Sequence, residues 1–191
     1  MNDQIDHAIA SPDVSPAVSR RAAITTATGL AISTFLPGYA ASAGDAIAGL
    51  IRTAEEKNAA FMNGDMDRWA SLARIAPDFT LMQPFGGPAS HGFDASPKRL
   101  AELSRYFQGG ETALEVGQTY ASEKLVVLVM IERQRGKVGG LPDQDWSLRV
   151  TEVYRKDGSE WELVHRHADP LVHHMNLEQA AALARGATRI D

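Results

Sequence analysis

The 191-residue sequence contains no cysteine. Disulfide bonds, thiolate metal sites and cysteine nucleophiles are therefore excluded. The sequence also lacks a cluster of basic residues, because its formal net charge is −5 and charges of both signs are spread along the chain. A protein that binds the phosphate backbone needs a clustered basic face, so we expect no nucleic-acid partner. Phosphate-loop, nucleophile-elbow and dinucleotide fingerprints are absent as well, which excludes those enzyme classes.

Long hydrophobic runs are also missing. The uncharged stretch from Ala22 to Leu36 is only mildly apolar and is shorter than the roughly 20 residues that a membrane span needs. It follows Ser19-Arg20-Arg21, which resembles a twin-arginine export signal, and it precedes the small-x-small cleavage pattern Ala41-Ser42-Ala43. We therefore expect residues 1–43 to be a signal peptide, and the protein to be periplasmic or secreted without a stable membrane anchor after cleavage. The alternative is a core helix or a disordered tail that contains Arg-Arg by chance.

Helical patterns come first in the remaining chain. Apolar residues recur at helical spacing from Asp45 to Asn63, and Gly64 provides a left-handed stop. Asp65 is a typical cap for a second short helix, which would run through Trp69 and Leu72. Further along, the pattern predicts a strand over 79–83, a loop over 84–94, and a third helix that begins after Ser96-Pro97 and ends at Gly109-Gly110.

After Gly110 the period changes to alternation, which is typical of strands. The pattern predicts strands over 114–120 and 125–131, then a hairpin of 146–155 and 161–168 around Asp157-Gly158. Asn176 and Gln179 resemble the capping pair of a last helix. The sequence therefore predicts an α+β domain over residues 44–175, in which N-terminal helices wrap one face of a curved antiparallel sheet and enclose a pocket, followed by a C-terminal helix and tail over 176–191.

The order of these elements resembles the SnoaL-like branch of the nuclear transport factor 2-like superfamily. The resemblance rests on the following residues: Asn63-Gly64-Asp65, Trp69, Asp78-Phe79, Gly86-Gly87, Gly92, Arg149-Val150-Thr151, Asp157-Gly158, Trp161 and Leu163-Val164-His165-Arg166-His167. It implies a cone-shaped domain, a homodimer formed through the sheet, and a pocket between helices and sheet for a small-molecule ligand. We assign no cofactor. The superfamily includes ketosteroid isomerases, scytalone dehydratase and polyketide cyclases, together with domains that only bind ligands or assemble. The acid pair of the ketosteroid isomerases is not recognisable in this sequence.

His165 and His167 are the first candidates for chemistry. One residue separates them on a predicted strand, so both side chains project to the same face, and Asp169 shares that parity. A histidine can exchange protons near neutral pH, and a carboxylate can orient it, so we interpret the three as a catalytic group. The alternative is a structural role in the sheet or at the dimer face.

The same His-x-His pattern is also a geometry for two zinc ligands. A third ligand would have to come from His91, His173 or His174, whose positions the sequence does not fix. Because a structural zinc site needs four ligands, we assign no metal.

Arg149, Thr151 and Arg166 are candidate ligand-binding residues. Assembly domains that this sequence resembles hold small carboxylates with pocket arginines, so either arginine is a candidate anion anchor. Arg149 and Thr151 share one strand face, whereas Arg166 faces away from His165 and His167. A slip of one residue in the hairpin would exchange the faces, so the sequence leaves open which set enters the pocket. The alternative to an anion anchor is an arginine that lies on a solvated strand face or forms a cross-strand pair with Glu132 or Glu152.

Trp69 and Met82 are expected in the pocket wall, together with Phe61, Phe85 and Phe107, although core packing explains these residues equally well. Two functions remain open. The first is an isomerase, lyase or cyclase that acts on a small apolar substrate through histidine acid/base chemistry. The second is a non-catalytic module for ligand binding or assembly. Histidines that face the pocket would favour the enzyme, and histidines on the outer sheet face would favour the binding module.

Overall fold

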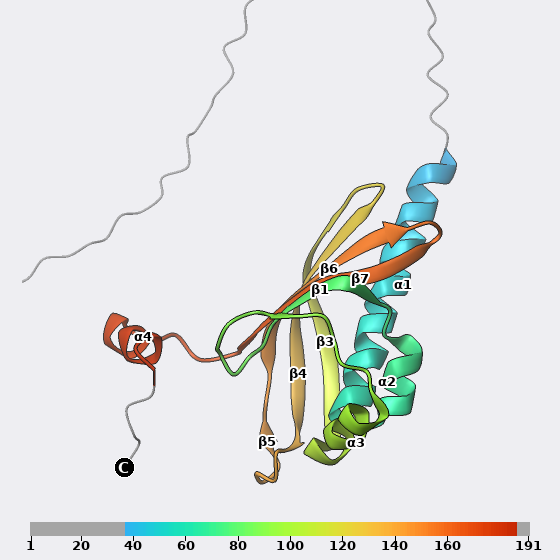
Figure 1. Cartoon of the computed structure of the whole chain (residues 1–191). Helices are drawn as coiled ribbons and strands as arrows, with labels where there is room; N and C mark the ends of the chain where they lie inside the picture. The colour runs from blue at the N-terminus through green and yellow to red at the C-terminus, as the bar shows by residue number, and fades with distance from the viewer. Residues whose placement is uncertain (1–36, 187–191) are drawn as a thin grey trace, which may run out of the picture. The chain divides into compact units, whose positions relative to one another are not determined.

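The computed structural model describes residues 37–186, with side chains from residue 44 onward. Its helices are α1 (Pro37–Met62), α2 (Met66–Leu72), α3 (Pro97–Tyr106) and α4 (Leu177–Ala184). Its strands are β1 (Ile75–Met82), β2 (Ser90–His91), β3 (Phe107–Ala121), β4 (Leu125–Val138), β5 (Gln144–Asp145), β6 (Leu148–Asp157) and β7 (Glu160–Pro170). The predicted α+β class with a curved sheet is confirmed (Figure 1).

The strands form one sheet in the order β2-β1-β7-β6-β4-β3, and β5 pairs with β4. Most neighbours are antiparallel, as the sequence predicts, but β1 and β7 run parallel. The sheet is therefore mixed. The parallel pair joins the first and last long strands of the domain. No local sequence pattern marks this pairing, because α3 and three other long strands lie between β1 and β7.

The helices begin and end largely where their caps predict. Asp65 accepts a hydrogen bond from the backbone N–H of Arg68 and caps α2, while Ser96 does the same for α3 through Arg99. Asn176 and Gln179 form the predicted capping box of α4. Pro37 starts α1, which agrees with the tolerance of proline in the first helical turn. The rest of the expected signal peptide, residues 1–36, lies outside the described residues.

The Gly109-Gly110 pair lies inside β3, so the prediction that it ends α3 is wrong. The helix ends at Tyr106, and β3 already begins at Phe107. Gly110 instead allows β3 to approach α1, since a Cβ at this position would lie 2.4 Å from the Cβ of Met62. The Asn63 side chain donates to the Gly110 carbonyl at 2.8 Å and holds the end of α1 against the strand.

The helices α1, α2 and α3 cover one face of the sheet (Figure 1). α1 packs along β3 and β4, α2 packs on α1, and α3 contacts α2 and β3. The core between these layers contains the following side chains: Leu50, Ala54, Phe79, Val126, Leu128, Met130, Leu148, Val150, Tyr154, Leu163 and Ala168. In contrast, α4 buries none of its residues. Among the described residues, no helix is long and apolar enough to cross a membrane.

Candidate functional site

A pocket of about 130 Å³ lies inside the cone, between the helices and the sheet. We call it the inner pocket. Its apolar wall comes from α1, α2, β1, β7 and the segment before α3, and consists of Phe61, Trp69, Ile75, Phe79, Leu81, Phe93 and Leu163. Its polar wall consists of Lys57, Asn58, Glu132, Glu152 and Arg166. Aromatic walls with a few polar groups are typical of small-molecule sites.

Arg166 is the centre of the polar wall. Its guanidinium donates to both oxygens of Glu132, at 2.8 and 2.6 Å, and to Glu152 at 2.9 Å. The two carboxylate side chains are 2% and 1% exposed, whereas the Arg166 side chain is 21% exposed. Three of its five N–H groups are used in this way. The Nε–H and the second N–H of Nη2 donate to no other described residue, so they are available to a molecule in the pocket.

Lys57 and Tyr154 complete the network around Glu152. The Lys57 ammonium lies 3.0 Å from Glu152 Oε1 and 3.3 Å from the Tyr154 hydroxyl oxygen, and the Tyr154 hydroxyl donates to Glu152 Oε2. All three side chains are buried. Together with Arg166 and Glu132, they form a buried ionic network of two basic and two acidic side chains and one phenol. A buried charge is tolerated when it is paired and hydrogen-bonded in this way.

The network shifts the pKa values of Glu152, Tyr154 and Arg166. Burial alone would raise the pKa of Glu152, but the charges of Lys57 and Arg166 and the Tyr154 hydrogen bond lower that pKa to about 2. Burial and the Glu152 carboxylate raise the pKa of Tyr154 well above its usual value of 10. Burial would lower the pKa of Arg166, but Glu132 and Glu152 raise it above its usual value. At neutral pH, Glu152 is therefore ionised, Tyr154 neutral and Arg166 cationic.

A β-bulge explains why Arg166 faces inward. The β6–β7 register pairs Tyr154 with Leu163 but Val153 with His165, so Val164 is an extra residue on β7. Because side chains alternate along a strand, this residue places Leu163 and Arg166 on the same, helix-facing side. The face that the sequence left open is thus decided, and Arg166 enters the pocket.

The predicted catalytic residues lie on the opposite face of the sheet. None of the three residues His165, His167 and Asp169 lines the inner pocket. His165 Nδ1 lies 2.7 Å from Thr80 Oγ1, and His167 Nε2 lies 3.4 Å from Asp169 Oδ2. The structure brings these residues together on the face of the sheet that is turned away from the helices. We call this the outer face.

Arg149 and Thr151 share that outer face. Arg149 lies 3.6 Å from Asp169, and Thr151 pairs with His167 in the sheet. No group of three or more histidine, cysteine, aspartate or glutamate residues in the described chain is arranged to hold a metal ion. Of the ligand-binding residues that the sequence predicts on the hairpin, only Arg166 contributes to the inner pocket.

The predicted aromatic wall is right for some residues. Trp69 is buried and lines the inner pocket, where its ring lies 4.8 Å from that of Phe93 and 5.9 Å from that of Phe61. Met82 is 41% exposed and Phe85 is 62% exposed, and neither lines the inner pocket. Met82 pairs with His167, at the end of β1, so it belongs to the outer face.

The pairing of an arginine with Glu132 or Glu152, which the sequence left as the alternative, is the one that Arg166 makes. Lys57 was not predicted as a member of the site, although all three residues carry a signal in the sequence. Lys57 follows Leu50 and Ala54 on the apolar stripe of α1, where a charged residue is rare. Glu132 continues the buried alternation Val126-x-Leu128-x-Met130 on β4, and Glu152 interrupts the same alternation between Val150 and Tyr154 on β6. A charged residue at a position that the alternation assigns to the buried face indicates that a residue of opposite charge is buried next to it.

No family model matches the sequence, and no curated protein is similar enough to register as a relative. Solved structures do resemble it. A scytalone dehydratase candidate from Novosphingobium aromaticivorans superposes with a TM-score of 0.58 at 13% identity, covering 72% of this chain and 93% of that one. A nuclear transport factor 2-like superfamily protein from Salmonella enterica gives 0.55 at 14% identity, with coverages of 73% and 98%.

The CamKII hub homology domain of Chlamydomonas reinhardtii gives a TM-score of 0.50 at 18% identity, covering 66% of this chain and 99% of that one. These three proteins carry different descriptions on one architecture. At such identities the likeness establishes the fold and leaves the activity open, because one fold serves many functions.

Proposed function

We propose that this chain, which has the nuclear transport factor 2-like fold, is an exported protein that binds a small, uncharged and largely apolar molecule in its inner pocket. The observation that carries this proposal is the pocket itself, in which aromatic walls face a buried ionic network whose centre, Arg166, retains free donors. The non-catalytic binding module, which the sequence left as the second alternative, is therefore the function we favour.

The size of the inner pocket limits the ligand. Its volume of about 130 Å³ is well below the roughly 300 to 1,000 Å³ of drug-sized sites. An apolar cavity of roughly 150 Å³ in another protein accommodates benzene. The expected ligand is thus one ring or a short branched chain, with its apolar part against Phe61, Trp69 and Phe93.

The charge of the network argues for a ligand without net charge. Lys57 and Arg166 are balanced by Glu132 and Glu152, so an additional anion would enter a buried site without an unpaired cation. A hydroxyl or carbonyl group can instead accept from the remaining Arg166 donors. Arg166 would thus bind a neutral polar group, and not the carboxylate that the resemblance implied for it.

Binding is favoured over proton transfer for two reasons. The pKa of Glu152 is lowered to about 2 and that of Tyr154 is raised well above 10, so neither group exchanges a proton readily near neutral pH. His165 and His167, the predicted candidates for acid/base chemistry, lie on the outer face. The export part of the proposal rests on Ser19-Arg20-Arg21 and Ala41-Ser42-Ala43.

Titration calorimetry with phenol at pH 7 tests this function. We expect phenol to bind with a dissociation constant of about 1 mM or below. Benzoate, which has a similar ring but a negative charge, should bind at least about tenfold more weakly because the network offers no unpaired cation. A wild-type protein that does not bind phenol at about 10 mM ligand would contradict the proposal.

Two neighbouring residues on β1 provide a matched pair of variants. Leu81 lines the inner pocket and pairs with Arg166, whereas Met82 pairs with His167 and is exposed on the other face. Leu81→Trp should fill the pocket and abolish phenol binding, while Met82→Trp adds the same ring outside it and should leave binding intact. Equal affinities of the two variants would place the phenol somewhere other than the inner pocket.

A further inference from the structure

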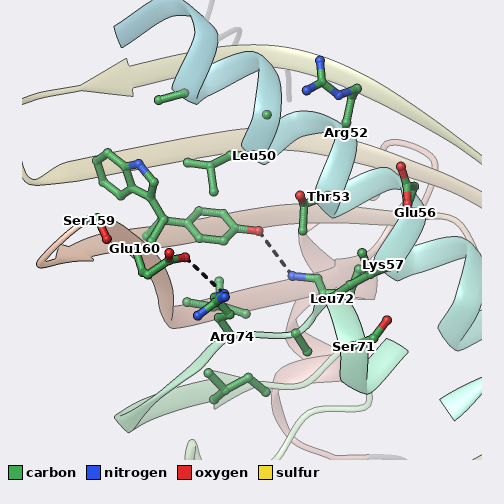
Figure 2. Close-up of a pocket in the computed structure, with 17 residues that line it drawn as sticks. Leu50, Arg52, Thr53, Glu56, Lys57, Ser71, Leu72, Arg74, Ser159 and Glu160 are labelled. Carbon is green, nitrogen blue, oxygen red and sulfur yellow. Dashed lines mark hydrogen bonds and ion pairs between the residues drawn. The ribbon is translucent and has the colours of Figure 1, made fainter. Parts of the chain in front are cut away.

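A second, larger pocket lies on the other side of Lys57. We call it the outer pocket. It has a volume of about 480 Å³ and lies between α1, the connection from α2 to β1, and the turn that joins β6 to β7 (Figure 2). Its rim carries the Arg74–Glu160 ion pair at 3.4 Å, and both of these side chains are mostly exposed. A cavity of this volume falls within the range of ordinary ligand sites.

Lys57, Ile75 and Leu163 line both pockets, so they form the wall between them. Tyr154 lies on the outer side of this wall and Glu152 on the inner side. Figure 2 shows the Lys57 side chain extending from α1 into the outer pocket, with its ammonium group bonded to a phenol hydroxyl. The bonds from Lys57 and Tyr154 to Glu152 therefore cross the wall.

Of the three wall residues, Lys57 is the one whose side chain is long, unbranched and held at its tip by polar contacts. Ile75 and Leu163 belong to strands β1 and β7, which pair with each other, so their positions are fixed by the sheet. Behind Lys57, the outer pocket offers apolar surface from Leu50 and Trp161. A ligand too long for the inner pocket would find apolar surface there if the Lys57 side chain were absent.

We propose that the two pockets are halves of one binding site, and that Lys57 is the residue that sets its ligand specificity by closing the inner half to molecules longer than one ring. This inference rests on the proposed function, because it assumes that the inner pocket binds a ligand. The closure is maintained by Glu152 and Tyr154, since displacement of the Lys57 ammonium would leave the buried carboxylate with one cation fewer.

The test compares two ligands, phenol and 4-butylphenol, and its readout is the ratio of their dissociation constants by titration calorimetry. In the wild-type protein 4-butylphenol should bind at least about tenfold more weakly than phenol, because its chain has no room. Lys57→Met removes the charged tip and keeps an unbranched apolar stem. In this variant the butyl group should enter the outer pocket, and the ratio should shift by at least about tenfold in favour of 4-butylphenol.

Gly49 provides the control for the path of the butyl group. It lies on α1 and lines the outer pocket, and a Cβ at this position would meet no atom within 4 Å. Gly49→Trp in the Lys57→Met background should fill the outer pocket and return the ratio to its wild-type value. Gly49→Ala in the same background should keep the shifted ratio. Both substitutions replace a helical glycine, so neither is expected to harm α1.

The outcomes separate the two proposals. Failure of phenol to bind the wild-type protein contradicts the proposed function, and this inference with it. Phenol binding with an unchanged ratio in Lys57→Met overturns this inference alone, and so does a shifted ratio that Gly49→Trp fails to reverse. If Lys57→Met does not fold, Lys57→Gln keeps a donor for Glu152 on a shorter stem and should shift the ratio in the same direction.

Discussion

The Lys57 ammonium and the Glu152 carboxylate lie 3.0 Å apart in the core and join α1 to β6 across 95 positions of sequence. Tyr154 and Arg166 bond to the same carboxylate, so Glu152 is the member of the network that contacts most of the others. Because it is ionised and buried, the stability of the fold depends on its charge state. This dependence leads to a prediction about the stability of the protein at acidic pH.

We predict that the free energy of unfolding falls as the pH decreases from about 5 to about 2. The folded-state pKa of Glu152 is lowered from 4.5 to about 2, so the ionised form stabilises the fold above the unfolded pKa, and this contribution is lost as the pH falls through the folded one. One pKa unit corresponds to about 1.4 kcal/mol, which gives a contribution of about 3 kcal/mol at neutral pH. Urea denaturation across this pH range measures it.

Glu152→Gln is the control for this prediction. The variant should be less stable than the wild type at pH 7, because Lys57 and Arg166 lose a buried counter-charge. Its stability should also depend less steeply on pH between 5 and 2, since the group that titrates is gone. An acid dependence as steep as that of the wild type would assign the effect to other carboxylates.

The sequence predicts most of the elements because their signals are local. Caps at Asp65, Ser96 and Asn176 identify helix starts, and the turn at Asp157-Gly158 identifies the last hairpin. The candidate site is different, because it depends on which strand face meets the helices. The bulge at Val164 places both Leu163 and Arg166 on that face, and no pattern in the sequence of β7 marks the bulge.

The same limit explains the misplacement of the histidines. Strand parity correctly groups His165 with His167 and separates them from Arg166. Parity states only which residues share a face, whereas the packing of α1 against the sheet decides which face is internal. Glu132 and Glu152 are better indicators of the internal face, because each alternates with apolar residues that are themselves buried in the core.

Export can be tested independently of the fold. We predict that changing both Arg20 and Arg21 to Lys leaves an unprocessed precursor inside the cell, because twin-arginine export requires the paired guanidinium groups. Cell fractionation and immunoblotting measure the precursor and the processed form. If the variant still reaches the periplasm, and loses delivery only when the general secretory route is blocked, the twin-arginine assignment is wrong.

A third prediction concerns the outer face of the sheet, which helices α1, α2 and α3 leave uncovered. Val129 is 37% exposed on β4 and lies beside Thr151 of β6 on this face. We predict that the protein is a homodimer that buries this face, because a symmetric pair covers an apolar patch on both copies at once. Sedimentation should show a dimer at micromolar concentration.

Val129→Asp should convert that dimer to a monomer, because two negative charges would be buried across the symmetric contact. Leu177→Asp is a matched control, since Leu177 is 83% exposed on α4. It should leave the dimer unchanged. A wild-type protein that sediments as a monomer contradicts the prediction, and a dimer that Val129→Asp does not affect requires a different interface.

Three consecutive residues of β7 provide the last prediction, because His165, Arg166 and His167 alternate between the two faces of the sheet. Arg166→Met should abolish phenol binding and lower stability by about 3 to 5 kcal/mol, since it leaves Glu132 and Glu152 without their shared partner. His165→Ala loses its contact with Thr80 and should lower stability by only about 1 kcal/mol. His167→Ala should have a still smaller effect, because its pair with Asp169 is longer and more exposed.

Neither histidine variant should change the affinity for phenol by more than about twofold. Thermal melts and calorimetry on the same preparations separate stability from binding. If His165→Ala or His167→Ala weakens phenol binding by tenfold or more while the melting temperature is unchanged, a ligand contacts the outer face, and the acid/base role predicted from strand parity regains support. If only Arg166→Met loses binding, the helix-facing side of β7 is the functional one, and the histidines act in the sheet or at the dimer contact.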